Sequence, residues 1–397
     1  VALRLFAGHS SAVCSTADLT PESLRGLVES CESLARSTAA DPFSGLPDDS
    51  GLAARVPDLD LYDDSAEQIG AEEAIAIARA TEEAALTADP RITNSEGAEF
   101  EAGTNRLLYR TTRGVSGDYR TSSFSLSVVP VAAQDGRMQQ DYWYTAARRR
   151  GDLESPESVG RTAAARALRR LGARSVRTCE VPIVFDPEMA ASLLGHFASA
   201  VSGSSVYRGL SFLSGRIGAR IAGESITLVD DALLPRRLGS RPFDAEGLPT
   251  RRNVIVEGGV LAGYLLDTYA ARKLGMQSTA SAVRSFGDVP SAGASNFYLE
   301  AGGDPPDQII ASVREGLYVT ELSGFGVNPV TGDYSRGAGG LWIENGRLTF
   351  PVEEVTVAGN LLDMIASIEM IGNDLRFRSR IAAPTLKVAR MTVAGSG

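Results

Sequence analysis

The chain has 397 residues, of which 43% are hydrophobic and 22% charged, a composition typical of a globular protein large enough for two domains. Its formal net charge of −10 argues against a nucleic-acid-binding surface, because such a surface needs clustered Lys and Arg. No apolar run approaches the roughly 18 residues of a membrane helix, so we expect neither a nucleic-acid nor a membrane partner.

The first part of the sequence predicts an α+β domain over residues 1–178. Thr20-Pro21 and Ser155-Pro156 each combine an N-cap residue with a first-turn proline, which is typical of a helix start. The predicted elements are helices at residues 20–36, 65–88 and 155–172, a loop at 41–64, and short strands across 91–147. We interpret the strands as an antiparallel sheet that buries one face against the first two helices.

Residues 179–397 predict a β-rich domain that carries two or three helices. Asp186-Pro187 begins one helix, and Gly275 ends another that starts near Asp267. The predicted elements are a strand at 179–185, helices at 186–203 and 267–274, a hairpin at 253–266 around Gly258-Gly259, and a last strand at 385–393. The whole chain is therefore predicted to be α+β, with an N-terminal antiparallel sheet packed with helices and a β-rich C-terminal domain.

The glycine-rich segment of residues 320–360 is the most informative stretch. Asn345-Gly346 supplies the positive φ values of a two-residue hairpin turn. Upstream, TGDYSRGA (residues 331–338) allows close approach of the backbone and offers a carboxylate, a hydroxyl and a guanidinium. Two interpretations remain open: an Asp–Arg pair and a hydroxyl that satisfy the local backbone, or side chains that line a substrate channel or a subunit contact. The candidates for the second are Asp333, Tyr334, Ser335, Arg336, Trp342 and Asn345.

This segment resembles the TldD/PmbA family, and within it the PmbA (TldE) branch. The motifs that carry the resemblance are NSEG (94–97), LGSRPFDAEGLPTRR (238–252), LDTYAARKLGMQST (266–279), TGDYSRGA (331–338), WIENG (342–346) and PVEEVTVAGNLLDM (351–364). They are spread over most of the chain. The resemblance also implies that on the order of 50 family residues, with the first strands and helix of the N-terminal domain, precede Val1.

The resemblance directs attention to the helix after Asp186. In the TldD branch the corresponding helix carries H-E-x-x-x-H after two leucines, where the histidines hold a zinc ion and the glutamate can act as general base. Here Gly195, His196 and Ala200 occupy these three positions. Glycine and alanine cannot bind a metal, and no cysteine follows Cys179 to match the family's remaining ligand. We therefore predict no metal, no cofactor and no catalytic residue in this chain.

Other catalytic chemistry finds little support in the residues. His9 is predicted to lie in a turn, and His196 is either packed in its helix or in contact with a partner or substrate. No G-x-S-x-G elbow and no P-loop occurs. The locally basic residues 146–150 and 169–174 are interpreted as solvated charge on helix faces. Three cysteines without CxxC spacing are typical of buried, reduced thiols in a cytoplasmic protein: Cys14, Cys31 and Cys179.

The resemblance implies a non-catalytic subunit of a heterodimeric zinc metallopeptidase. A TldD-type partner would supply the zinc, and both subunits would enclose a cavity for flexible or unfolded peptides, such as leader peptides and antitoxins. A sheet edge can hold an extended peptide, and we expect the glycine-dense residues 324–346 to do so. Two alternatives remain: a metal-free peptide-binding or scaffolding homodimer, and an autonomous enzyme whose site the sequence does not reveal.

Overall fold

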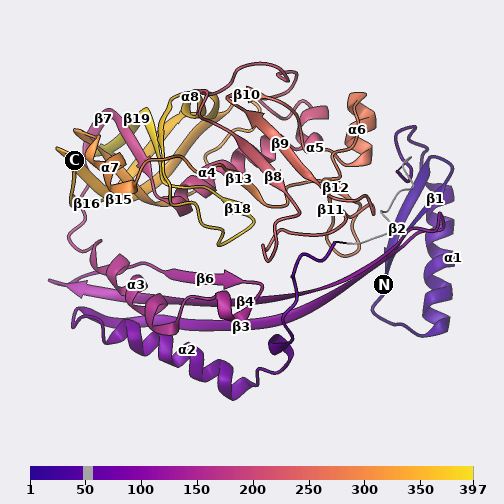
Figure 1. The fold of residues 1–397 in the computed structure, drawn as a ribbon, viewed down its shortest axis with the longest axis horizontal. Helices are drawn as coiled ribbons and strands as arrows, with labels where there is room; N and C mark the ends of the chain where they lie inside the picture. The colour runs from indigo at the N-terminus through magenta and orange to yellow at the C-terminus, as the bar shows by residue number, and fades with distance from the viewer. Residues whose placement is uncertain (48–56, 397) are drawn as a thin grey trace.

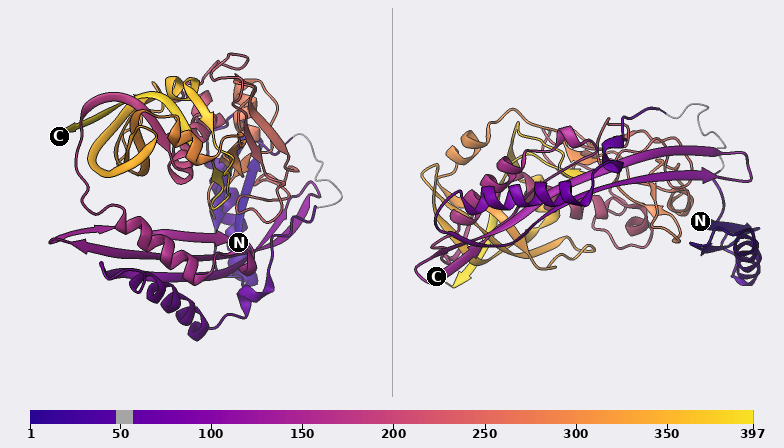
Figure 2. Two further views of the ribbon diagram at one scale, coloured as in Figure 1. Left: turned by 60° about the vertical axis from the view of Figure 1, so that its left-hand side comes forward. Right: turned by 90° about the horizontal axis from the view of Figure 1, so that it is seen from below.

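The fold is α+β, as predicted, and has three parts that follow one another along the chain (Figure 1). The structure is a computed structural model that describes residues 1–47 and 57–396. We name the parts the N-terminal unit, the central layer and the C-terminal body. Figure 2 shows the central layer lying along one side of the C-terminal body, with the N-terminal unit at one end.

The N-terminal unit is a two-stranded hairpin covered by one helix. β1 (Ala2–Ala7) pairs antiparallel with β2 (Ser10–Ser15), and α1 (Pro21–Ser37) packs against both. His9 lies in the turn between the strands, as predicted. Cys31 of α1 is buried against this hairpin, where its thiol donates to the Leu3 and Ala12 carbonyls. The prediction that the first helix covers the long sheet is therefore wrong.

The central layer is built on two strands of 19 residues each. β3 (Ile92–Arg110) pairs with β4 (Ser116–Gln134), and the other side of β4 pairs first with β6 (Trp143–Ala147) and then with β5 (Arg137–Gln140). α2 (Ala71–Leu86) and α3 (Pro156–Leu168) cover one face of this sheet (Figure 1). Two short 3₁₀ helices, Asp64–Glu67 and Arg150–Asp152, flank the layer. The opposite face of the sheet carries no helix and looks toward the C-terminal body.

Two predictions about the central layer are wrong. The strands are long rather than short, because Gly97 lies in a bulge of β3 and Gly117 lies within β4. A side chain at Gly117 would overlap the Phe243 ring of the C-terminal body, so this glycine marks a close contact and not a strand end. The second helix begins at Ala71 instead of residue 65, since the Asp63 side chain caps the separate 3₁₀ turn.

The C-terminal body contains a closed ring of strands. β16, β15, β14, β7 and β19 pair in this order, β16 pairs again with β19, and β17 adds to β19. Asn345 (φ 50°) and Gly346 (φ 76°) form the predicted hairpin turn between β15 and β16. The strands are β7 (Arg177–Phe185), β14 (Glu315–Ser323), β15 (Asp333–Glu344), β16 (Arg347–Asn360), β17 (Ile368–Ile371) and β19 (Leu386–Ser396).

A five-stranded sheet packs beside the ring, with α4 between them. Its order is β10 (Val260–Leu261), β9 (Arg252–Glu257), β8 (Leu228–Asp231), β13 (Phe297–Leu299) and β18 (Ile381–Ala382), and β11 (Ala282–Val283) pairs with β12 (Ser291–Ala292) nearby. Five helices belong to the described body, more than predicted: α4 (Pro187–Ala200), α5 (Gly203–Tyr207), α6 (Thr268–Leu274), α7 (Pro306–Ala311) and α8 (Leu361–Ala366). No helix in the described ranges has both the length and the apolar character to cross a membrane.

Buried acidic residues lie where the tip of the β3–β4 hairpin meets the C-terminal body. The Tyr109 hydroxyl of β3 donates to the Glu246 carbonyl at 2.8 Å. The Glu246 carboxylate accepts from the Thr268 amide at 2.8 Å and lies near Asp244 and Asp267. Burial, together with these neighbouring carboxylates, raises the pKa of Glu246 to about 7. The contact between the β3–β4 hairpin and the C-terminal body therefore contains one carboxyl group, that of Glu246, whose pKa lies near neutral pH.

Candidate functional site

The structure brings the altered metal-motif helix and the TGDYSRGA segment together. The Tyr334 ring lies edge-on to His196, with ring centroids 6.1 Å apart, and Arg336 Nη1 donates to Ser192 Oγ at 3.0 Å. Alternate residues of a strand share a face, so Tyr334 and Arg336 both point toward α4, whereas Asp333 and Ser335 are exposed. We name Ser192, His196, Tyr334 and Arg336 the α4–β15 cluster.

Two polar atoms of the α4–β15 cluster are buried without a hydrogen-bond partner among the described residues: His196 Nε2 and the Tyr334 hydroxyl oxygen. Burial raises the pKa of Tyr334 to about 12, although the nearby Arg336 guanidinium opposes this shift. Burial, and then the charge of Arg336, lowers the pKa of His196, so the imidazole is neutral at pH 7. The cluster therefore presents neutral hydrogen-bonding groups beside one fixed positive charge.

Arg336 holds the cluster to the strand that precedes it. Its remaining donors reach the Leu322 and Gly324 carbonyls, each at 3.2 Å. Asp333 and Arg336 do not pair, because Asp333 accepts from the Thr331 hydroxyl at 2.6 Å, but Arg336 does bind local backbone carbonyls, as that interpretation expects. Leu322 also lines a pocket described below, so Arg336 contacts one wall of that pocket.

The α4 positions that the resemblance assigns to metal binding hold no donor side chains. At Gly195 a Cβ atom would lie 3.6 Å from Ile381 Cδ1, so space for a side chain exists but no ligand fills it. Ala200 is buried, and its carbonyl accepts from Ser211 Oγ at 2.6 Å. Across residues 1–47 and 57–396, no three His, Cys, Asp or Glu side chains gather as a possible metal site. The residues present do not fit a zinc ion.

Trp342 and Asn345 lie at the far end of β15 from the α4–β15 cluster. Trp342 is buried and stacks on Phe350 with ring centroids 6.4 Å apart, which makes it part of the core. Asn345 is exposed in the hairpin turn, and its amide donates to the Arg314 carbonyl at 2.7 Å. The structure therefore does not bring these two candidates to the site.

The glycines of residues 324–346 serve the packing of the strands themselves. A side chain at Gly340 would overlap the Tyr318 carbonyl, and one at Gly326 would overlap the Ser335 carbonyl. β15 is paired with β14 on one side and β16 on the other, so it has no free edge for a peptide. The expectation that this segment receives an extended peptide is wrong.

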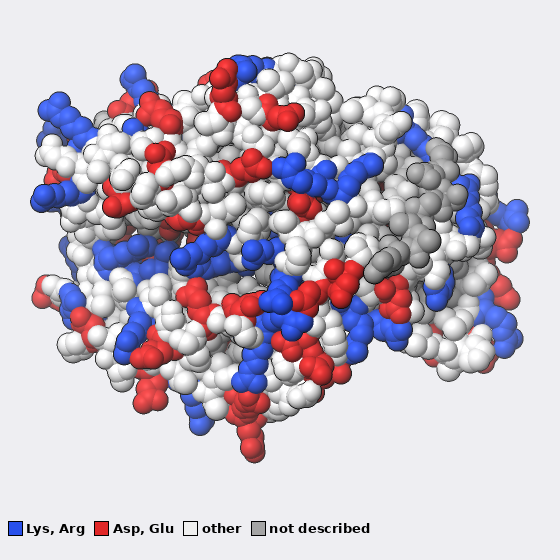
Figure 3. Space-filling view, viewed as in Figure 1, with Lys and Arg blue, Asp and Glu red and all other residues white. Residues whose placement is uncertain are grey.

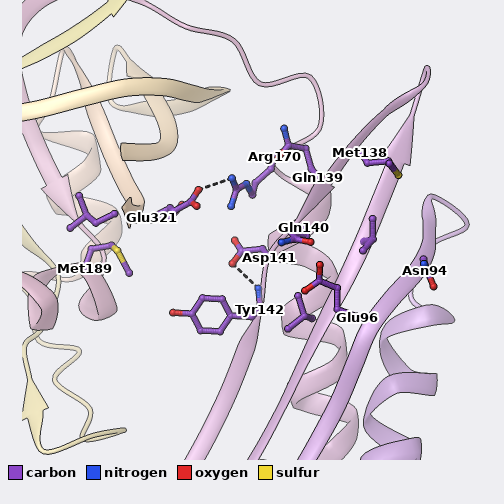
Figure 4. A pocket seen from close by; sticks show the side chains of 14 residues that line it. Asn94, Glu96, Met138, Gln139, Gln140, Asp141, Tyr142, Arg170, Met189 and Glu321 are labelled. Carbon is purple, nitrogen blue, oxygen red and sulfur yellow. Dashed lines mark hydrogen bonds and ion pairs between the residues drawn. The ribbon is translucent and has the colours of Figure 1, made fainter. Parts of the chain in front are cut away.

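A cleft lies between the helix-free face of the central layer and the C-terminal body. One pocket of this cleft has a volume of about 700 Å³ (Figure 4). β5, which pairs only with β4 in the described chain, contributes Met138, Gln139 and Gln140 to one wall. The opposite wall contains Met189 of α4 and residues 320–322 of β14. This pocket therefore lies between the start of the α4 helix and β5, a strand that pairs on one side only in the described part of the chain.

Ion pairs join the two walls of this pocket. Arg170 after α3 pairs with Glu321 of β14 at 2.6 Å, as Figure 4 shows. Behind it, the buried Arg166 lies 3.3 Å from Asp141 and 3.6 Å from Asp186. Asp186 also caps α4 through the Met189 amide at 2.8 Å, although burial raises its pKa. The start of α4 is thus fixed to the central layer.

A third contact bridges the cleft in its middle. Arg378, in the loop before β18, donates to Glu154 at 3.0 Å and to Glu188 of α4 at 3.3 Å. Its guanidinium lies over the Trp143 ring, 4.3 Å from the centroid, and Tyr144 donates to Glu188 at 3.0 Å. The loop of residues 372–380, which carries Arg378, therefore lines the cleft.

The basic stretches of the sequence belong to these interlayer contacts. Arg148 donates to the Ser122 carbonyl at 2.8 Å and to the Leu238 carbonyl at 2.6 Å, and Arg170 pairs with Glu321 as described. The interpretation of residues 146–150 and 169–174 as solvated helix faces is therefore wrong. Their partners are distant in sequence, and no local spacing signals them.

Comparison with known proteins assigns the chain to a class and then to a family. Residues 64–171 match the PmbA/TldA metallopeptidase central domain, and residues 178–395 match the PmbA/TldA metallopeptidase C-terminal domain. The class is thus that of the metallopeptidases, although the α4 helix lacks metal ligands. The chain belongs to the PmbA/TldD family, which confirms the resemblance found in the sequence.

Similar proteins cover nearly the whole chain. Metalloprotease PmbA of Escherichia coli O157:H7 is 39% identical over 96% of this chain and 82% of its own length. The PmbA homolog of Haemophilus influenzae is 36% identical over 99% of this chain and 85% of its own. A Bacteroides thetaiotaomicron structure described as a modulator of DNA gyrase has a TM-score of 0.91 at 32% identity, covering 100% of this chain and 88% of that one. TldE of Thermococcus kodakarensis shares the fold, with a TM-score of 0.85 at 21% identity over 97% and 87% of the two chains.

Proposed function

We propose that this chain is the non-catalytic, TldE/PmbA-type subunit of a heterodimeric metallopeptidase. A TldD-type partner supplies the zinc ion, and the pair cleaves flexible or unfolded peptides, such as leader peptides during peptide maturation and antitoxins. We place the pair in the cytoplasm, because the free cysteines Cys14, Cys31 and Cys179 suit a reducing compartment.

One observation carries this proposal. The helix that corresponds to the family's metal-binding helix is intact and well anchored, yet its ligand positions are Gly195 and Ala200. A protein that lost activity and had no further use for this region would be free to lose the helix geometry as well. Here the Asp186 cap, the Glu188 bridge and the α4–β15 cluster all hold α4 in place. The helix therefore serves a role other than metal binding.

The chemistry of this chain is that of holding and orienting a peptide. His196 and Tyr334 offer a neutral imidazole and a neutral phenol, because burial, assisted by the charge of Arg336, lowers the pKa of His196, and burial raises the pKa of Tyr334. In the pocket of about 700 Å³ between β5 and β14, the edge of β5 that does not pair with β4 offers main-chain hydrogen bonds. Main-chain pairing depends little on sequence, which suits varied peptide substrates. Bond cleavage itself belongs to the partner subunit.

A second candidate function is a metal-free peptide-binding or scaffolding homodimer. The observation in its favour is that both walls of the pocket come from this single chain, so a peptide could bind without a partner. In that case the pair of identical chains would bind peptides and leave them intact.

Cleavage of an unstructured fluorogenic peptide distinguishes the two functions. We would assay the isolated chain, a TldD-type partner from the same genome, and the two mixed. Cleavage by the mixture alone, or a large acceleration on mixing, supports the proposal. A His196→Ala variant should lower activity in the mixture without abolishing it, because His196 orients the peptide and holds no metal, whereas replacing a histidine of the partner's H-E-x-x-x-H motif should abolish it. Cleavage by the isolated chain would refute the proposal, and binding without cleavage in every combination would favour the scaffold.

A further inference from the structure

Three exposed arginines lie in two loops of the C-terminal body that border the cleft. Arg237 belongs to the loop that follows β8, and Arg376 and Arg380 lie between β17 and β18, on either side of the bridging Arg378. Within the part of the chain that the structure describes, no carboxylate lies at ion-pair distance from these three side chains. The neighbouring Arg236 differs, since it pairs with Asp60 and Asp152.

The loops enclose a second pocket of the cleft, with a volume of about 370 Å³. Its walls include Ala147 of β6, Arg237 and Phe377, together with Asp152 and Arg236, which form an ion pair with each other at 3.9 Å and so leave Arg237 as the unpaired charge among the described lining residues. The Arg237 guanidinium lies over the Phe377 ring, 4.6 Å from the centroid. Stacking on a ring holds a guanidinium in place and leaves its N–H groups at the edge free for a carboxylate.

Charge sets this region apart from the rest of the molecule. The chain carries a net charge of −10, so an acidic ligand is repelled by most of its surface. Figure 3 shows Lys and Arg side chains gathered along the hollow between the central layer and the C-terminal body. An acidic segment that enters this hollow beside Arg237 meets a guanidinium that has no ion-pair partner among the described residues.

We propose that the pocket around Arg237 and Phe377, with Arg376 and Arg380 beside it, binds acidic side chains of an extended peptide. The ligand class is a flexible, Glu- or Asp-rich peptide segment. A pocket of this size between two protein layers admits side chains of a single extended strand and excludes a folded domain or a nucleic-acid duplex. This inference deepens the proposed function, because it assigns the selection of acidic substrates to this subunit. It rests on the proposed function only for the later cleavage of the bound peptide.

Fluorescence anisotropy with the isolated full chain tests the inference. The probes are labelled, unstructured Gly/Ser peptides that carry Glu, Gln or Lys at alternate positions. We expect the Glu peptide to bind at least roughly tenfold more tightly than the Gln peptide at low ionic strength, and this preference should shrink as salt is added. The Lys peptide should bind most weakly.

Two triple variants with the same net charge locate the site. Arg237→Gln/Arg376→Gln/Arg380→Gln should abolish the preference for Glu. Arg25→Gln/Arg79→Gln/Arg347→Gln, which changes exposed arginines on α1, α2 and β16, should keep it. Thermal unfolding checks that both variants are folded. The single Arg237→Glu variant should invert the preference toward the Lys peptide, and this result does not depend on the triple variant folding.

Four results would overturn the inference. Equal affinity for the Glu and Gln peptides is the first, and equal loss in the two triple variants is the second. The third is a loss of association with the TldD-type partner, without a loss of peptide binding, in Arg237→Gln/Arg376→Gln/Arg380→Gln. These arginines would then belong to a subunit interface. Tighter binding of a single-stranded oligonucleotide than of the Glu peptide would also reject a peptide site. The anisotropy measurements themselves contain neither zinc nor partner, so their failure leaves the proposed function standing.

Discussion

Replacing Tyr334 with Phe removes a buried hydroxyl that has no hydrogen-bond partner among the described residues. The Tyr334 side chain is 1% exposed, and its hydroxyl, although close to the Arg336 guanidinium, makes no hydrogen bond among the described residues. A buried polar group without a partner costs about 1–3 kcal/mol. The gap left by one oxygen loses a few dispersion contacts of about 0.1–0.2 kcal/mol each. We therefore expect Tyr334→Phe to raise the free energy of unfolding by about 1 kcal/mol.

Tyr264→Phe is the matched control, because Tyr264 is buried in the same hydrophobic core with its hydroxyl satisfied. It donates to the Leu213 carbonyl at 2.6 Å and accepts from the Arg216 amide at 3.3 Å. Its removal costs each backbone group one hydrogen bond, although the two still bond to each other at 3.2 Å, and should lower the free energy of unfolding by about 1 kcal/mol. The two Tyr-to-Phe changes should thus act in opposite directions.

Urea unfolding of the isolated chain measures both variants. Circular dichroism and tryptophan fluorescence should give coincident transitions, which would show that a single unfolding step is being compared. A loss of stability in Tyr334→Phe comparable to that in Tyr264→Phe would refute the reasoning, since the hydroxyl would then have a strong partner. If Tyr334→Phe is more stable but the assembled peptidase is less active, we infer that the Tyr334 hydroxyl hydrogen-bonds to the bound peptide.

Three further outcomes follow from the geometry. Glu246 binds a proton in the folded state between its ordinary pKa of 4.5 and about 7, where the unfolded chain has released it, so stability should fall as pH rises through this window. Glu246→Gln should remove that fall, which amounts to at most about 3 kcal/mol when followed by urea unfolding at a series of pH values. Gly340→Ala should cost about 3 kcal/mol or more, because its side chain would overlap a backbone carbonyl of β14, and the midpoint of thermal unfolding should show it. Arg378→Met should speed hydrogen exchange in β6 and at the start of α4, and lower stability by about 1–3 kcal/mol, because Glu188 and Glu154 lose a largely buried partner.

Each of these outcomes has a result that would contradict it. An unchanged pH profile in Glu246→Gln would show that the group does not titrate in this window. Gly263→Ala is the control for Gly340→Ala, since nothing lies within 4 Å of its Cβ position, and equal losses in the two would reject the steric explanation. Exchange that speeds up evenly over the whole chain in Arg378→Met would mean that Arg378 does not specifically hold the two layers together.

Local signals in the sequence predict several elements of the fold correctly. Asp186 caps α4, Asp267 and Gly275 bound α6, and Asn345-Gly346 turns the β15–β16 hairpin, because each depends on side chains within a few residues. The lengths of β3 and β4 could not be predicted from such local signals. Gly117 resembles a strand break until the Phe243 ring is seen to occupy the space of its missing side chain.

The candidate site depends on tertiary pairing that no spacing reveals. His196 and Tyr334 meet only because β14 and β15 pair beside β7, which places the start of β15 next to α4. Arg148 and Arg170 find partners across the cleft, in Leu238 and Glu321, which are far away in the sequence. What could be predicted without the structure is the loss of ligands at Gly195 and Ala200, since that depends on residue identity alone.

The zinc content of the isolated chain tests the central claim most directly. The purified full chain would be equilibrated with zinc, desalted and measured by mass spectrometry, alone and after assembly with a TldD-type partner. We expect no stoichiometric zinc in the chain alone and one zinc ion per assembled pair, unaffected by His196→Ala. A zinc ion bound stoichiometrically to the isolated chain, and lost in His196→Ala, would contradict the account.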